Sequence, residues 1–169
     1  TSQIELLWNP CFSAYTFSNT LKHANYTISQ ANRQTDLTTT TTRFVVALVE
    51  PQLPLQTTSK IMFKIEELVG QGWESATEAS SRKTASFANV PCLPNSGSAA
   101  SQGAYIALYH GFVYSHSNND DNGKQLNRIT YREGDIVTVE LNPYDGTLTY
   151  SKEGVAPYVQ QTSIRSTSN

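Results

Sequence analysis

The fold is decided by the stretch from Arg132 to Tyr158, which reads Arg-Glu-Gly-Asp-Ile-Val-Thr-Val-Glu-Leu-Asn-Pro-Tyr-Asp-Gly-Thr-Leu-Thr-Tyr-Ser-Lys-Glu-Gly-Val-Ala-Pro-Tyr. In its first half Val137, Val139 and Leu141 alternate with polar residues. This period of two places the apolar side chains on one face of an extended chain, as in a half-buried strand. The pattern predicts a strand that contributes one face to a hydrophobic core.

The residues between the two alternating runs, Asn142 to Gly146, favour a tight loop. Pro143 cannot donate to a strand ladder, and Gly146 supplies the positive φ that closes a hairpin loop of this length. Leu148 and Tyr150 then resume the alternation. The sequence therefore predicts an antiparallel hairpin.

Outside this hairpin the apolar residues come in short runs, and helix signals are almost absent. Runs of this length and spacing, with Thr and Tyr abundant, indicate an all-β sandwich or barrel rather than alternating βα units. The runs are Ile4–Trp8, Tyr26–Ile28, Phe44–Val49, Ile61–Val69, Gly103–Val113 and Ile129–Tyr131.

One of these runs is compatible with both strand and helix. Ile61, Phe63 and Ile65 alternate with polar and charged residues, which predicts a strand with these three side chains inward. One or two helical turns fit the same segment. Its β-branched content and the nearby Gly70 and Gly72 favour the strand.

Two polar stretches are predicted to be loops. Thr35 to Thr42 contains five consecutive Thr residues and is expected to be an exposed loop, with a strand as the alternative because Thr is β-branched. Ser80 to Gln102 is long and rich in Ser, Ala, Pro and Gly, so it is expected to be functional or disordered.

The order of the C-terminal pieces resembles the signature of SPRY (B30.2-type) domains. Gly134–Leu141 is similar to the Gly-Asp-hydrophobic strand of that family, and Asp145–Gly154 to the following strand, which closes with an aromatic residue, a polar residue, Lys and a turn that ends in Gly. Here Tyr150 replaces the usual Phe and Glu153 the usual Asn. Weaker similarities, in the family order, cover Leu7–Pro10 with Phe17–Asn19, Thr58–Glu66 and Gly103–Gly111. The Gly-rich strand that the family has after the segment corresponding to Glu66 is missing, and Trp73–Thr77 is the candidate for its position.

The resemblance implies a bent antiparallel β-sandwich of two sheets, of the concanavalin-like kind, in which loops at one end recognise a protein segment. The expected organisation is a single SPRY-like β-sandwich domain over residues 1–161, followed by a flexible tail over 162–169, because chain termini commonly fray. Members of the family serve as binding modules in larger proteins, among them ubiquitin ligases and their adaptors, scaffolds and channels. The expected function is therefore non-enzymatic protein–protein interaction.

Composition limits the other possibilities. A chain of 169 residues and 18.7 kDa corresponds to about one domain. The formal net charge is −2 and the 12 Lys and Arg residues are scattered, which argues against a nucleic-acid module. No apolar run approaches the roughly 20 residues that a spanning helix needs. No nucleic-acid partner and no membrane insertion are expected.

The cysteines and the first residue bear on the cellular setting. Cys11 and Cys92 make neither a disulfide framework nor a metal site, and free buried thiols are favoured over a single bridge. A reducing, cytoplasmic location is expected. Asn25 satisfies a glycosylation sequon, which matters only if the chain is secreted. The start at Thr1 suggests a processed product, an excised domain or a piece of a longer chain.

Metal and cofactor sites find little support in the sequence. His23, His110 and His116 have no metal-ligand spacing. The segment Asn118–Gly123 fits the first half of a calcium loop, but the twelfth position is Ile129, which cannot supply the carboxylate that such loops need. No metal and no cofactor are expected.

Catalysis has equally weak signals. The chain contains no Gly-x-Ser-x-Gly elbow and no Cys in a recognisable nucleophile context. Glu74 and Glu78 would share one face of a strand, so a glycosidase on a lectin-like sandwich is conceivable. A solvated face is the preferred interpretation, and no catalytic residue is assigned.

The predicted binding surface lies at loop ends around Trp73, Arg82, Tyr109 and His116. In this hypothesis Trp73 or Tyr109 gives apolar anchoring, Arg82 a charge-assisted contact to an acidic or carbonyl-rich peptide, and His116 an adaptable hydrogen bond. The rings near turns that are expected to be partly exposed also include Tyr114 and Tyr144, whereas Tyr105, Tyr131 and Tyr150 are predicted to lie in the core.

Two other functions share the predicted architecture. A carbohydrate-binding sandwich would use aromatic platforms beside Asn and Asp, for which Tyr114 and Asn118–Asn122 are candidates. A structural subunit of a large assembly would pack through its sheet edges, with the Thr-rich segments draped over its neighbours.

Overall fold

The structure is a computed structural model that describes residues 3–7, 15–22, 24–31, 33–37, 47–67, 76–80, 104–108, 111–115, 117–118, 120, 123–126, 130–162 and 164. Within these ranges the regular elements are strands, and no helix occurs. Every strand pairing is antiparallel. The predicted all-β class is confirmed.

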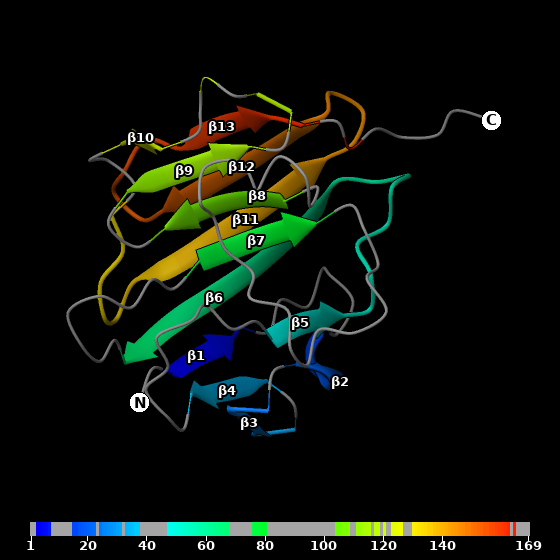
Figure 1. The fold of residues 1–169 in the computed structure, drawn as a ribbon, viewed down its shortest axis with the longest axis vertical. Helices are drawn as coiled ribbons and strands as arrows, with labels where there is room; N and C mark the ends of the chain where they lie inside the picture. The colour runs from blue at the N-terminus through cyan, green and yellow to red at the C-terminus, as the bar shows by residue number, and fades with distance from the viewer. Residues whose placement is uncertain are drawn as a thin grey trace.

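The strands form three sheets (Figure 1). The large sheet has the order β13 (Tyr158–Gln161), β12 (Thr147–Lys152), β11 (Ile136–Asn142), β6 (Ser59–Glu67), β1 (Gln3–Leu6), β4 (Gln34–Leu37) and β3 (Tyr26–Ser29). A second sheet has the order β10 (Lys124–Gln125), β9 (Phe112–Ser115), β8 (Ala104–Leu108) and β7 (Ala76–Ser80). A pair of strands, β2 (Thr16–Lys22) and β5 (Ala47–Glu50), completes the fold.

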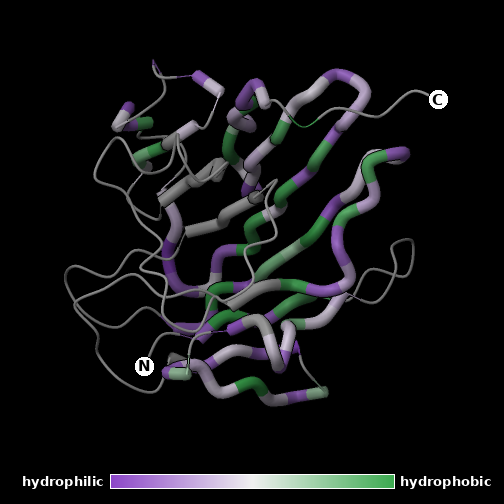
Figure 2. The backbone as a smooth tube through the Cα atoms, turned by 45° about the vertical axis from the view of Figure 1, so that its right-hand side comes forward, coloured by the Kyte–Doolittle hydropathy of each residue, from purple (hydrophilic) through white to green (hydrophobic). Residues whose placement is uncertain are grey.

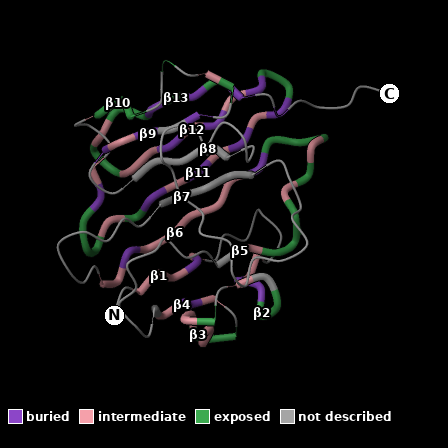
Figure 3. The backbone as a smooth tube through the Cα atoms, viewed as in Figure 1, coloured by how far each residue is buried: buried purple, intermediate pink, exposed green. Residues whose placement is uncertain are grey.

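The predicted hairpin is β11 and β12. Val139 pairs with Tyr150 and Leu141 with Leu148, so the apolar side chains of both strands share one face. All four are buried, and Leu148 and Tyr150 have no exposed surface. The loop between the strands closes through Gly146 at a φ of 63°. Alternating hydrophobic and hydrophilic positions along the strands are visible in Figure 2 and alternating buried and half-buried positions in Figure 3.

The segment with two interpretations is strand β6, at the centre of the large sheet. Ile61 lies opposite Val139 and Phe63 opposite Val137, so the inward face predicted for this segment is continuous with that of the hairpin. Ile65 is buried on the same strand. The strand interpretation is correct because the segment completes a face that β11 has already made apolar.

The core lies between the large sheet and the four-stranded sheet. Val113 of β9 belongs to the same buried cluster as Val139, Leu148 and Tyr150, which shows that the two sheets pack face to face. Figure 1 shows β7, β8 and β9 lying across β6, β11 and β12. This arrangement of two packed layers is a β-sandwich. The pair β2–β5 is an addition to the two predicted sheets.

Two segments that were expected to be an exposed loop and a flexible tail, residues 35–42 and 162–169, contain buried residues. Thr35 belongs to β4 and is 2% exposed, so the predicted loop over 35–42 begins as a buried strand; residues 38–42 lie outside the described part. Thr162 donates its amide hydrogen to the Gly146 carbonyl at 2.8 Å, and Ile164 is buried in the core. Core packing therefore extends beyond residue 161, where the tail was expected to begin.

Candidate functional site

The four residues predicted to form the binding surface, Trp73, Arg82, Tyr109 and His116, lie outside the described residues. Their proposed roles stay predictions.

The register of the strands next to these residues is described. Ala76 pairs with Leu108, whereas Ser80 pairs with Ala104 at the other end of the same pair of strands. Ser115, the last residue of β9, pairs with Tyr105 near that second end. The first residue of β7 thus lies at the same end of this sheet as the last residue of β8, and the last residue of β7 lies at the end near Ser115.

Among the described residues, an exposed surface forms where two loops meet at one end of the large sheet. One is the 51–58 segment that joins β5 to β6, and the other is the loop between β11 and β12. We call residues 53–57 together with 142–146 the hairpin-end surface. The 51–58 segment is largely exposed, and in the hairpin loop Tyr144 and Asp145 are exposed whereas Pro143 and Gly146 are buried; Figure 3 draws the exposed positions in green. A loop end carried by a rigid sheet is a common place for a binding site.

The hairpin loop is fixed by Asn142. Its side-chain oxygen accepts hydrogen bonds from the backbone amides of Tyr144 at 3.1 Å and Asp145 at 3.3 Å. Its side-chain amide donates to the Asp145 carboxylate at 2.7 Å. Pro143 is buried and Gly146 adopts the left-handed conformation. Because an Asn side chain can replace a backbone turn bond in this way, the loop has one defined shape.

Tyr144 is the most exposed large hydrophobic side chain of the described residues, with 63% of its surface accessible. Its hydroxyl donates a hydrogen bond to the Gln56 carbonyl on the other loop. Leu53 and Leu55 of that loop pack against the core, which anchors the loop. The ring is therefore held at its backbone and at its hydroxyl while it remains open to solvent.

The charge of the hairpin-end surface comes from a single residue. Asp145 is exposed and forms no ion pair with any described residue. The surface contains no Lys or Arg. The nearest strand lysine along the sequence, Lys60, is paired with Glu140 at 2.8 Å. An uncompensated carboxylate thus lies next to an exposed aromatic ring in the sequence of the loop.

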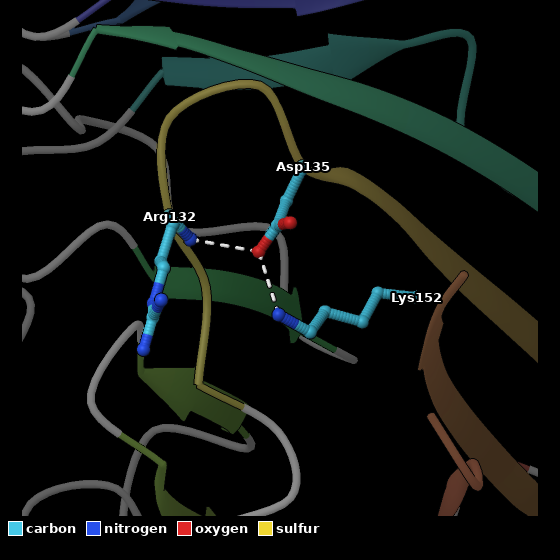
Figure 4. A network of polar contacts seen from close by, with 3 residues as sticks. All are labelled: Arg132, Asp135 and Lys152. Carbon is cyan, nitrogen blue, oxygen red and sulfur yellow. Dashed lines mark hydrogen bonds and ion pairs between the residues drawn. The ribbon is translucent and has the colours of Figure 1, made fainter. Parts of the chain in front are cut away.

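The opposite end of the same hairpin holds a polar network (Figure 4). One carboxylate oxygen of Asp135 accepts a hydrogen bond from the Arg132 amide at 2.8 Å and from the Lys152 ammonium at 2.7 Å. Two backbone bonds tie the same turn to Ile65: its amide donates to the Asp135 carbonyl, and the Gly134 amide donates to its carbonyl. These contacts join the start of β11 to the end of β12 and to β6. The network is a structural clamp, because each Asp135 bond is used within the fold.

Figure 4 also shows the side chain of Arg132 pointing away from Asp135. Its guanidinium is exposed and forms no ion pair with the described residues. A single surface guanidinium is common on proteins and does not by itself define a site.

The buried tyrosines offer no sign of proton-transfer chemistry. Tyr131 is 4% exposed, and within the described part its hydroxyl has no hydrogen-bond partner. Burial raises the pKa of Tyr131 above its ordinary value and raises the pKa of Tyr26 to about 12. Both rings are therefore neutral at physiological pH. Tyr131 and Tyr150 lie in the core as predicted, and Tyr144 is exposed at a turn as predicted.

The alternative sites of the sequence analysis are only partly described. His23, His110, His116 and Glu74 lie outside the described residues. Across the part of the chain that is described, no three His, Cys, Asp or Glu side chains gather as metal ligands would. In the former calcium-loop candidate, the Asn118 side chain accepts a hydrogen bond from the Asp120 amide, which is a turn contact.

The described residues include no helix that is long and apolar enough to cross a membrane. The chain matches no protein-family model, and neither the curated proteins nor the solved structures contain a match.

Proposed function

We propose that this chain is a non-enzymatic protein-interaction module, SPRY-like in its sequence signature, that recognises a segment of another protein through the hairpin-end surface. The module acts within the cytoplasm as part of a larger protein or complex, such as a ubiquitin-ligase substrate receptor or a scaffold. The observation that carries the proposal is the exposed ring of Tyr144, which is fixed at both ends.

A fixed aromatic ring has a physical advantage as a binding anchor. Exposed side chains lose conformational entropy when a partner immobilises them, by about 0.5–1.5 kcal/mol for a flexible one. Tyr144 is already held by Asn142 and Gln56, so it has less entropy to lose on binding. Tyrosines of this kind are enriched among residues that dominate binding energy.

The charge of the surface favours a particular class of partner. Asp145 attracts a Lys or Arg side chain, and the face of Tyr144 stabilises a cation by about 0.5–1 kcal/mol at an exposed site. We therefore expect a peptide segment that contains a basic residue beside an apolar one. The earlier hypothesis, an acidic peptide held by Arg82, concerns a different surface and stays a separate prediction.

The test compares variants of the full-length protein in its own cells. Partners captured by the wild type are identified, and their purified binding regions are titrated by calorimetry against Tyr144→Ala, Tyr144→Phe, Asp145→Asn and Glu153→Gln. Glu153 is an exposed carboxylate at the other end of the hairpin, so its neutralisation is the matched control for Asp145.

We expect Tyr144→Ala to weaken binding about 30-fold, which corresponds to roughly 2 kcal/mol. Tyr144→Phe keeps the ring but frees it from the Gln56 carbonyl, so it should weaken binding less than Tyr144→Ala does, by about two- to tenfold. Asp145→Asn should weaken binding more than Glu153→Gln does. A partner that binds Tyr144→Ala and Asp145→Asn as tightly as the wild type would show that the proposed surface is wrong.

A carbohydrate ligand is the main competing function, because an exposed ring beside Asn and Asp also suits a sugar. Here the Asn142 amide and the Asp145 carboxylate are bonded to each other and to the turn, which leaves fewer groups for sugar hydroxyls. Saturable binding on a glycan array that disappears in Tyr144→Ala would favour the lectin over the peptide module. A structural role in a large assembly predicts instead that the isolated chain self-associates in sedimentation.

A further inference from the structure

Among the described residues the large sheet ends at β13, which pairs with β12 on one side only. At the other end of the sheet, the outer strand β3 has its Tyr26 carbonyl bound by the Lys22 ammonium at 2.6 Å. A lysine at a sheet edge is one of the features that hinder further strand pairing. The strand β13 carries no charged residue.

The hydrogen-bond pattern of β13 follows from one contact. Residues that face each other in an antiparallel pair alternate between those that exchange backbone hydrogen bonds and those that do not. Thr147 faces Gln161, so Gly146 and Thr162 are the next facing positions. The Thr162 amide donates to the Gly146 carbonyl at 2.8 Å, which makes that position a bonded one. By alternation Val159 and Gln161 are non-bonded positions, and their backbone groups point away from β12.

A second contact supports this assignment. The Gln161 carbonyl accepts a hydrogen bond from the Ser117 hydroxyl at 3.0 Å, from outside the large sheet. The outward groups that remain are the amide and carbonyl of Val159 and the amide of Gln161. Within the described part of the chain these three groups have no hydrogen-bond partner. Val159 is 51% exposed, and its side chain lies on the sheet face opposite the buried Tyr158 and Gln160.

The strand is held rigidly although its edge is open. Tyr158 and Gln160 are buried on the inward face, and the Tyr158 ring stacks on Tyr150 with centroids 6.4 Å apart. The edge therefore presents its free groups in a fixed, extended geometry. A donor and an acceptor on one residue, followed two positions later by a second donor, match the groups that another extended backbone offers.

We infer that the Val159–Gln161 edge accepts an extended segment of a partner polypeptide as an eighth strand of the large sheet. The segment pairs antiparallel, and one of its residues exchanges two backbone hydrogen bonds with Val159. An uncharged, β-branched or aromatic side chain on that residue packs beside the exposed side chain of Val159.

The size of the edge indicates a linear segment rather than a second copy of this chain. The strand has four residues, whereas a stable protein–protein interface buries about 800 Å² on each partner. A linear segment that binds this edge and a second surface as well can bury that area in total. The edge ends at Thr162, which is bonded to Gly146 of the hairpin-end surface, so one extended segment can continue from that surface along β13. In this respect the inference deepens the proposed function and rests on it.

The test begins with a random twelve-residue peptide library selected on the immobilised full chain. The recovered peptides are titrated against the wild type, Val159→Pro, Gln161→Pro, Val159→Thr and Tyr144→Ala. Proline removes an outward amide hydrogen without removing a β12 bond, and it is tolerated at such edge positions. Val159→Thr keeps both the amide and the β-branched shape and is the matched control.

We expect at least one peptide to lose tenfold or more in affinity with each proline variant and to stay within threefold with Val159→Thr. Its binding should also slow amide exchange at Val159 and Gln161. Recovery of no peptide, or equal binding to wild type and both proline variants, overturns the inference. If binding depends on Tyr144 but not on Val159, the proposed function stands and the edge inference fails. If both proline variants unfold, amide exchange of the wild type decides: peptide binding that does not slow exchange at Val159 and Gln161 overturns the inference.

Discussion

The ammonium of Lys152 lies 2.7 Å from a carboxylate oxygen of Asp135, although the two residues are 17 positions apart in the chain. The contact joins the last residue of β12 to the residue that precedes β11. Both side chains are largely buried, with 15% and 26% of their surfaces exposed. The sequence signature Gly-Asp followed by a second strand that ends in Lys therefore corresponds to a physical contact.

Asp135→Asn is expected to lower the free energy of unfolding by about 1–3 kcal/mol. The Arg132 amide keeps an acceptor, but the Lys152 ammonium loses its charged partner in a site with limited access to water. Urea unfolding at pH 7 measures the change. Glu153→Gln removes an exposed carboxylate from the following turn and is expected to stay within about 0.5 kcal/mol of the wild type. Equal effects of the two substitutions would mean that the ion pair adds no stability.

Gly111→Ala is expected to destabilise the protein by at least about 2 kcal/mol. A Cβ at Gly111 would lie 2.5 Å from the Leu126 carbonyl oxygen, and the φ of 91° is unfavourable for Ala. At Gly123 the φ is 73° but nothing lies within 4 Å of the added carbon, so Gly123→Ala should cost only about 1 kcal/mol. Thermal unfolding of the two variants separates steric overlap from backbone strain. Similar melting temperatures would contradict the close approach of the β9 and β10 strands.

Stability is expected to fall at alkaline pH because of the buried tyrosines. The folded-state pKa of Tyr26 is about 12 and that of Tyr131 is also raised, whereas the pKa of a tyrosine in the unfolded chain is near its ordinary value of 10.0. Above that value the unfolded chain releases protons that the folded chain keeps, so the unfolded state becomes favoured. The stabilising contribution is complete below pH 10 and is lost as the pH rises toward the folded-state values.

Tyr131→Phe provides the measurement for this pH dependence. The substitution removes a buried hydroxyl that has no partner among the described residues, so stability at pH 7 should be unchanged or higher. Urea midpoints of the variant should fall less between pH 9 and 11 than those of the wild type. Identical pH profiles would contradict the raised pKa of Tyr131.

Tyr144→Ala is expected to leave the free energy of unfolding within about 1 kcal/mol of the wild type. The ring is 63% exposed, and its hydroxyl makes one hydrogen bond to the Gln56 carbonyl. Circular dichroism and urea unfolding check this outcome, which also qualifies the variant as a binding probe. A loss of several kcal/mol would mean that the two loops of the hairpin-end surface depend on the ring for their structure.

The hairpin was predictable because its information is local. The alternation of Val137, Val139 and Leu141 and the turn residues Pro143 and Gly146 lie within ten consecutive positions. The two strands β6 and β11 pair as neighbours, and each is apolar on one face. That alternation is visible in the sequence of each strand by itself. The sequence pattern carries this kind of information directly.

The strand β13 was missed because its hydropathy opposes its burial. Gln160 has no exposed surface, whereas Val159 is half exposed. Hydropathy alone would place Val159 toward the core and Gln160 toward solvent, which is the reverse of what the structure has. The position of the strand is instead set by its ladder with β12 and by the stacking of Tyr158 on Tyr150, and both are tertiary contacts.

The hairpin-end surface was predictable only in part. A ring beside a turn was expected to be exposed at Tyr144, but the contact that fixes it joins residues 88 positions apart. No local sequence pattern predicts a contact between residues so far apart in the chain. A loop that contains a proline, an aromatic residue and an acidic residue in succession is the sequence signal that points to this surface.

The burial of Ile164 has a practical consequence for anyone who shortens or labels this protein. A version that stops at Gln161 would lack a side chain that packs in the same cluster as Tyr150 and Tyr158, and it would also lack the Thr162 amide that donates to Gly146. Such a version should melt at a lower temperature for reasons unrelated to its loops. Affinity handles and fluorophores are better attached after a spacer that leaves Ile164 in place.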